Sequence, residues 1–326
     1  MSNLEQRPAE TLTGAVPLPR GARQVLAPRE VPLGGPRAML VRRTLPHRDL
    51  RTVGAWCFLD DYGPHDITGT SGMQVPPHPH TGLQTVTWLL DGEVRHQDSL
   101  GSDAPVRPGE LNLMTAGRGI SHAETSPAGA TGRLRGLQLW VALPARDRDT
   151  APDFAHHGDL PRVEGDGLTV TVLMGTLAGA VSPARTFTPI VGVEVVLAAG
   201  ARAALPLEPG FEHGVLALSD GLTVNGERLE QSSLEHLGTG RSEVVVTAGR
   251  DGGRVFLLGG EPFDEELLMW WNFVARSHDE VVEAREEWMA AVDGATTRFC
   301  QVTGYDGGAL AAPALPTSRL RPRRNR

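Results

Sequence analysis

The chain has 326 residues and a mass of 34.8 kDa, enough for two ordinary domains that each bury a core. Its composition is 40% hydrophobic and 21% charged, with 39 glycines and 25 prolines, which is typical of a turn-rich globular protein. The formal net charge of −8 excludes a general electrostatic attraction to nucleic acid or to an anionic membrane surface. We therefore expect an all-β protein with neither nucleic acid nor membrane as a partner.

Targeting and redox signals are few. No stretch approaches the roughly 18 consecutive apolar residues of a membrane span, and residues 1–20 lack the apolar core of a signal peptide. The two cysteines, Cys57 and Cys300, lie far apart, so neither a disulfide framework nor a cysteine-based metal site is indicated. The sequence predicts a cytoplasmic protein with two ordinary thiols.

The first half of the chain has a strand-and-turn pattern. Residues 1–30 are rich in proline, glycine and polar residues and predict an N-terminal arm that orders only in part. From about residue 38, short apolar runs alternate with glycine, proline and aspartate clusters, as in a barrel or sandwich. Asp91-Gly92 predicts a type I′ turn that joins its flanking strands as a hairpin. The first domain is placed at residues 31–145.

The second half repeats this pattern. Residues 143–167 are rich in proline, aspartate and glycine and are interpreted as a linker, and a new strand-rich stretch begins near residue 168. Asn225-Gly226 repeats the hairpin signal. A capping box at Ser277 and Glu280 then predicts a helix with apolar residues at helical spacing: Val281, Ala284, Trp288 and Val292.

The second domain is placed at residues 146–295, and a C-terminal tail follows at 296–326. The last residues, 319–326, are basic and interrupted by proline. Such a segment is predicted to remain an unfolded, solvated tail.

Two pairs of polar residues at strand spacing are the candidates for chemistry. His78 and His80 would project to one side of a strand, because successive side chains alternate faces, and the same rule puts His122 and Glu124 on a common face. Turn signals between the pairs allow the chain to return, so that two facing strands converge on one ion in a barrel mouth. Three neutral imidazoles and a carboxylate suit a first-row divalent metal and leave positions open for substrate or O₂.

The sequence around these pairs resembles the pirin family. The similarity is carried by residues 78–93, which begin His-Pro-His-Thr-Gly, by residues 98–101, and by residues 114–124, Met-Thr-Ala-Gly-Arg-Gly-Ile-Ser-His-Ala-Glu. It extends more loosely over residues 211–218 and 270–274. The resemblance implies a bicupin, two cupin-type antiparallel β-barrels with a few short helices. It also implies one divalent metal ion, expected to be Fe(II), held in the first barrel by His78, His80, His122 and Glu124.

The resemblance further implies a second barrel without metal, in which His213 is structural. Thr81 and Gln84 stand where pirins commonly have Arg and Glu, so we expect altered polarity and anion preference beside the metal. Trp88 and Met114 are candidates for the lining of the mouth. His96 is not assigned to the site, because the sequence does not fix its parity relative to either ligand pair.

Two classes of function follow from the resemblance. As an enzyme, the chain would be an iron-dependent dioxygenase of quercetin or a similar flavonol, a small aromatic substrate that reacts with O₂. Glu124 would then also be the catalytic base that accepts the substrate's hydroxyl proton. As a regulator, the chain would sense metal or redox state and bind a transcription factor or metabolic enzyme without turnover. A closed apolar pocket at an open coordination position favours the enzyme, and a shielded ion beside a flat charged surface favours the regulator.

Overall fold

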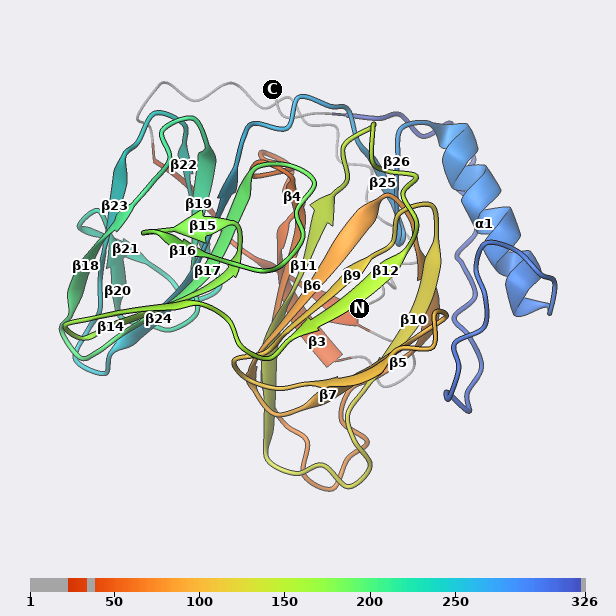
Figure 1. Cartoon of the computed structure of the whole chain (residues 1–326), viewed down its shortest axis with the longest axis horizontal. Coiled ribbons are helices and arrows are strands. Elements are labelled where there is room, and N and C mark those ends of the chain that lie inside the picture. The colour runs from red at the N-terminus through yellow and green to blue at the C-terminus, as the bar shows by residue number, and fades with distance from the viewer. Residues whose placement is uncertain (1–22, 34–38, 324–326) are drawn as a thin grey trace.

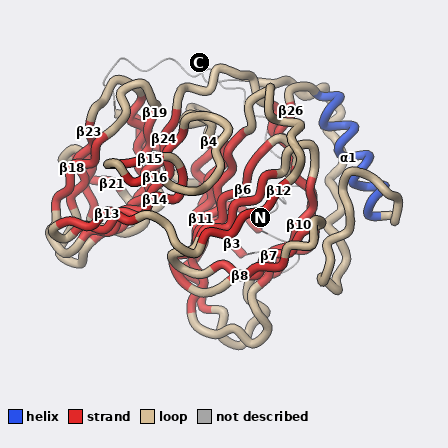
Figure 2. Tube along the Cα trace, viewed as in Figure 1, coloured by secondary structure: helices blue, strands red, loops and turns tan. Residues whose placement is uncertain are grey.

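A computed structural model describes residues 23–33 and 39–323, so most of the predicted arm (1–22) and the last three residues (324–326) lie outside it. Strands dominate the described residues, and the helix α1 (His278–Val292) flanks them. Figures 1 and 2 show two β-rich halves side by side, with α1 beside the first half. Each half has a seven-stranded and a four-stranded antiparallel sheet, which is a jelly-roll arrangement of the expected all-β class.

The first half contains the predicted ligand pairs. Its seven-stranded sheet has the order β12 (Asp153–His157), β9 (Leu111–Thr115), β6 (Leu83–Asp91), β11 (Arg133–Ala142), β4 (Trp56–Asp66), β3 (Met39–Leu45) and β2 (Arg29–Leu33). Its four-stranded sheet has the order β5 (Gln74–His80), β10 (Ile120–Thr125), β7 (Val94–Asp98) and β8 (Asp103–Val106).

The second half follows the same plan. Its seven-stranded sheet has the order β1 (Gln24–Leu26), β22 (Leu234–Gly238), β19 (Glu212–Ala217), β24 (Gly253–Gly260), β17 (Ile190–Leu197), β14 (Leu168–Met174) and β13 (Arg162–Gly165). Its four-stranded sheet has the order β18 (Arg202–Pro206), β23 (Glu243–Thr247), β20 (Leu222–Val224) and β21 (Glu227–Leu229). Two short hairpins complete the strands: β15 (Thr176–Leu177) with β16 (Ala180–Val181), and β25 (Leu268–Trp270) with β26 (Phe273–Ala275).

The two halves share a hydrophobic core. The indole N–H of Trp56 on β4 contacts the main-chain oxygens of Val191 (3.2 Å) and Gly259 (3.1 Å) in the second half. Trp88 on β6 donates its indole N–H to Glu194 Oε1 at 3.2 Å. The prediction that Trp88 lines the mouth is therefore wrong, because strand alternation turns its side chain toward the second half.

The two predicted hairpin turns differ. At Asn225-Gly226 both residues have positive φ, 51° and 86°, and β20 pairs with β21 across them, so this hairpin is confirmed. At Asp91-Gly92 only Gly92 has positive φ, also 86°, and β6 and β7 belong to different sheets. The hairpin predicted there is wrong, because the chain uses Gly92 to pass from one sheet to the other.

The predicted linker is only partly irregular. Within it, β12 adds to the edge of the first half through β9, and β13 pairs with β14 in the second half. The helix α1 begins after Ser277, whose side chain accepts the N–H of Glu280, as predicted. Val281, Ala284 and Trp288 are buried against the β25–β26 hairpin, whereas Val292 at the last turn is 36% exposed.

The C-terminal tail packs across the first half. The N–H of Leu310 donates to the Pro77 oxygen (2.8 Å) on β5, and the Gln97 side chain on β7 donates to the Gly304 oxygen (3.0 Å). Near its end, Arg323 and Leu267 exchange two main-chain hydrogen bonds of 2.8 Å. The predicted unfolded tail is thus wrong for residues 319–323. Among the described residues, no helix has the length and apolarity needed to cross a bilayer.

Candidate metal centre

The candidate centre lies on the four-stranded sheet of the first half. His78 and His80 end β5, and His122 and Glu124 lie on β10, so each pair shares one face as the alternation predicts. The strands β5 and β10 are hydrogen-bonded neighbours rather than opposed strands, and His122 lies directly opposite His78. A register shift between His122 and Glu124 bends β10 against β5.

The strand pairing brings three imidazoles together. His78, His80 and His122 each offer a ring nitrogen within 4.8 Å of the others. The ring centroids are 4.4 Å apart for His78 and His122 and 5.0 Å apart for each of the other two pairs. Glu124 offers a carboxylate oxygen within 4.8 Å of both His122 and His96. Such spacing allows several of these groups to contact a single ion.

The hydrogen bonds of the three rings indicate which nitrogens face the centre. Nδ1 of His78 lies 2.9 Å from the Pro76 oxygen, and Nδ1 of His80 lies 3.0 Å from the Asn272 oxygen. Because a carbonyl only accepts, Nδ1 is the N–H of each ring, and Nε2 retains its lone pair. In all three histidines Nε2 is buried without a hydrogen-bond partner. Three unpaired buried acceptors in one place fit a metal ion, which would satisfy them together.

Burial keeps the three imidazoles neutral. His78, His80 and His122 are fully buried, and their desolvation lowers the pKa of each well below its ordinary value. An imidazole binds a metal ion only in its neutral form. Because these three rings are already neutral near pH 7, none of them has to lose a proton before a cation binds.

Glu124 is oriented from the facing sheet. Its Oε1 accepts the hydroxyl of Thr87 on β6 at 3.1 Å, and the same hydroxyl lies 3.0 Å from the side-chain amide of Gln138 on β11. A hydroxyl has one hydrogen, so if Thr87 donates to Glu124, Gln138 must turn its NH₂ group toward Thr87. This series of hydrogen bonds fixes the orientation of the carboxylate, and Thr87 supplies a donor to its ionised form.

The C-terminal region contributes to the centre as well. The Asn272 oxygen that orients His80 belongs to the turn between β25 and β26, where Trp271 has a positive φ of 51°. This hairpin is fixed beside β5, because Val274 N–H donates to the Thr81 oxygen at 3.0 Å. The turn was not predicted from the sequence, because only the tertiary structure brings residues separated by 192 positions into contact.

His96 is a residue of the centre that the sequence did not reveal. It lies on β7 opposite Glu124 and is 2% exposed, and its Nδ1 is 3.3 Å from Nδ1 of His122. A signal existed in the spacing His96-x-Asp98, which puts both side chains on one face of a strand. Only the folded structure shows that β7 pairs with β10 in the register that puts His96 opposite Glu124.

Of the two departures from the common pirin pattern, Gln84 points away from the centre and Thr81 directly follows His80. Gln84 follows the face of β6 opposite to Thr87 and donates to Thr115 Oγ1 (3.0 Å) and to the Arg185 oxygen (3.2 Å) of the second half. Thr81 forms a bridge with Phe273. The expectation of altered polarity beside the metal is therefore not met at Gln84. Met114 packs in a cluster with Trp140, whose ring lies 5.1 Å from that of His80.

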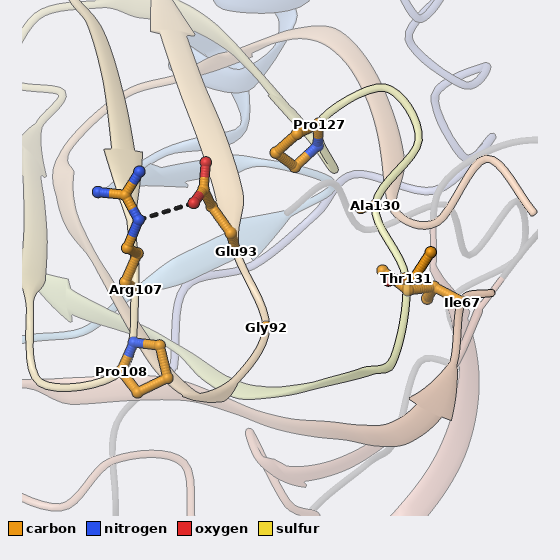
Figure 3. Close-up of a pocket in the computed structure, with 8 residues that line it drawn as sticks. All are labelled: Ile67, Gly92, Glu93, Arg107, Pro108, Pro127, Ala130 and Thr131. Carbon is orange, nitrogen blue, oxygen red and sulfur yellow. Dashed lines mark hydrogen bonds and ion pairs between the residues drawn. The ribbon is translucent and has the colours of Figure 1, made fainter.

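Two surface pockets lie away from these ligands. One is bordered by the ion pair between Arg107 and Glu93 (2.7 Å) on one side and by the loop carrying Pro127, Ala130 and Thr131 on the other (Figure 3). The second lies between α1 and the loops after β5 and β9, where Arg148 pairs with Glu280 at 2.6 Å. Neither pocket is lined by His78, His80, His122 or Glu124.

Two jelly-roll halves, the first with a buried cluster of histidines and a glutamate, define a bicupin with a candidate metal site. Comparison with known proteins agrees. Residues 38–141 match the pirin family model, and residues 192–292 match that of the pirin C-terminal cupin domain. A Pseudomonas aeruginosa protein, provisionally named a quercetin 2,3-dioxygenase, is 43% identical over 90% of this chain and 90% of its own length.

Two further relatives extend the comparison. A Caulobacter vibrioides protein named pirin-like is 37% identical over 77% of this chain and 88% of its own. The crystal structure of a quercetin 2,3-dioxygenase from Acinetobacter baumannii is 42% identical, with a TM-score of 0.86 over 93% of this chain and 98% of that one. The chain therefore belongs to the pirin family.

Proposed function

We propose that the chain is a metal-dependent dioxygenase of the quercetin type, with one Fe(II) held by Nε2 of His78, His80 and His122 and by the Glu124 carboxylate. The observation that carries this proposal is the set of three buried, unpaired Nε2 atoms on one strand pair beside Glu124. The names of the 43% identical P. aeruginosa relative and the 42% identical A. baumannii structure support the choice of reaction.

The surroundings of the histidines suit a flat aromatic substrate. The Trp140 ring lies 5.1 Å from His80 and stacks on Phe58 at 4.0 Å, and Phe154 stacks on His96 at 4.3 Å. Aromatic side chains on two sides of the site provide apolar contacts and exclude water. These aromatic surroundings support the choice of an aromatic substrate such as a flavonol.

The chain's own residues provide binding and proton transfer. When bound, Fe(II) supplies the Lewis-acid and redox chemistry that a reaction with O₂ needs. The neutral imidazoles would hold the ion without a charge of their own, and the Glu124 carboxylate would accept the hydroxyl proton of the flavonol. Thr87 holds Glu124 in position through its 3.1 Å hydrogen bond.

Oxygen uptake by the iron-loaded protein in the presence of quercetin tests the proposal. We expect uptake well above a free-iron control, and we expect Glu124→Gln to lose most of it while retaining some metal, because an amide oxygen still coordinates weakly but does not accept a proton. Glu212→Gln is the matched control, since Glu212 lies in the second half and accepts the Gly54 N–H. Metal binding without any oxygen uptake would instead favour the regulator.

A further inference from the structure

We propose that His96 and Asp98 are positioning residues that decide which ring nitrogen of His122 carries hydrogen, and thereby set the metal affinity of the centre. This inference rests on the proposed metal site and names two residues outside its ligand set. It is carried by an unbroken series of contacts from the turn after β7 to His122.

The series begins at Asp98, whose orientation is fixed by the backbone. Its Oδ1 accepts the N–H groups of Leu100 (2.9 Å) and Ser102 (3.0 Å) in the turn between β7 and β8. The side chain is fully buried, so its other oxygen cannot turn to solvent. Asp98 Oδ2 therefore stays directed at Nε2 of His96, 3.1 Å away.

His96 transmits this constraint to His122. The carboxylate of Asp98 only accepts, so Nε2 of His96 must carry the hydrogen and its Nδ1 is left as an acceptor. That Nδ1 lies 3.3 Å from Nδ1 of His122. His122 must then donate from Nδ1, which leaves its Nε2 lone pair bare at the centre.

Packing fixes the orientation of the His96 ring. It stacks on Phe154 of β12 with centroids 4.3 Å apart and an interplanar angle of 11°.

The other two proposed histidine ligands are oriented differently. Nδ1 of His78 and Nδ1 of His80 each face a main-chain oxygen, which always accepts and which no side-chain substitution changes into a donor. Of the three proposed histidine ligands, His122 is the one whose Nδ1 contacts a side chain rather than a main-chain oxygen.

The substitution Asp98→Asn tests whether Asp98 decides which ring nitrogens of His96 and His122 carry hydrogen. The amide oxygen of asparagine must stay with Leu100 and Ser102 N–H, so its NH₂ group turns toward His96. His96 then accepts at Nε2 and donates from Nδ1, and His122 is forced to accept at Nδ1 and to carry hydrogen on Nε2. The metal-facing lone pair is lost without removal of any ligand.

The measurement is Co(II) affinity of the full-length, metal-free protein, read from visible absorption in competition with a chelator. We expect Asp98→Asn to raise the Kd for Co(II) by about 10- to 100-fold. Asp103→Asn is the matched control on the same pair of strands, where Asp103 makes an exposed ion pair with Arg95. We expect this control to bind Co(II) as the wild type does.

A second pair of variants keeps the test valid if Asp98→Asn folds poorly. His96→Gln offers an amide oxygen to His122 Nδ1–H and should retain affinity within a few-fold, whereas His96→Leu fills the space without an acceptor and should lose it. Equal Co(II) affinity for wild type, Asp98→Asn and His96→Leu would overturn the inference and leave the metal site standing. A wild type that binds no Co(II) would overturn both.

Discussion

The four-stranded sheets of the two halves have the same plan but differ in the polarity of their buried side chains. In the first half, this sheet buries aliphatic residues such as Val75, Val94 and Val106, and it also buries ionisable groups: His78, His80, His96, Asp98, His122 and Glu124. In the second half, they hold aliphatic side chains: Ala203, Leu205, Leu222, Val224, Val244 and Val246. One half is closed by hydrophobic packing and the other is lined with groups that need partners.

The difference shows how the two interiors are stabilised. Burial of aliphatic groups stabilises the second half directly, at roughly 25 cal/mol per Å² removed from water. Burial of polar groups is unfavourable unless each finds a partner. The first half supplies partners for every Nδ1 of His78, His80 and His122 but leaves the Nε2 atoms unpaired, which is the pattern expected where a ligand completes the site.

The largest expected effect is loss of metal from the first half alone. His80→Ala should abolish binding of one metal ion per chain, because it removes a central ligand of the proposed set. His213→Ala, a buried histidine of the second half, is the matched control and should leave the metal content at one per chain. Elemental analysis after iron loading measures both. Full metal content in His80→Ala would show that the ligand set is wrong.

A second test concerns histidines in the half without predicted ligands. Burial lowers the pKa of His236 to about 4, so the folded protein keeps this ring neutral. Below pH 6.5 the unfolded chain binds a proton that the folded chain does not, so stability should decline as the pH falls from about 6.5 to 4. His236→Gln should reduce this decline by up to about 3 kcal/mol.

Urea unfolding at several pH values measures the effect of His236→Gln. Glutamine can still contact Gln24, which lies 3.2 Å from Nδ1 of His236, so the hydrogen bond is conserved while the titrating group is removed. A difference between the two proteins that does not change with pH would contradict the assignment.

The smallest expected effects distinguish the two glycine turns. Gly92 and Gly226 both have φ of 86°, so alanine is strained at either position. An added Cβ at Gly226 meets nothing within 4 Å, whereas at Gly92 it would lie 2.7 Å from the Arg133 oxygen. Gly226→Ala should cost about 1 kcal/mol and Gly92→Ala about 2–3 kcal/mol. Equilibrium urea unfolding measures the loss of stability in both variants. Equal losses would mean that the chain around Gly92 accommodates a Cβ despite the 2.7 Å approach to the Arg133 oxygen.

These same two turns show where local sequence rules fail. Asn225-Gly226 was predicted correctly because both residues tolerate positive φ and the flanking strands belong to one sheet. Asp91-Gly92 has the same local signal, but β6 and β7 pair with different partners. Residues 319–323 were mispredicted for a related reason, since the two main-chain hydrogen bonds between Arg323 and Leu267 need no apolar sequence pattern.

The sequence by itself determined the all-β class, the capped helix, the pirin resemblance and the common face of each ligand pair, because these depend on alternation, capping and motif spacing over a few residues. The tertiary structure alone decided that His122 lies opposite His78, that the Asn272 oxygen orients His80, and that His96 reaches His122. Those contacts depend on strand register and on pairing between distant segments, and a one-residue change of register would turn each of these side chains to the other face.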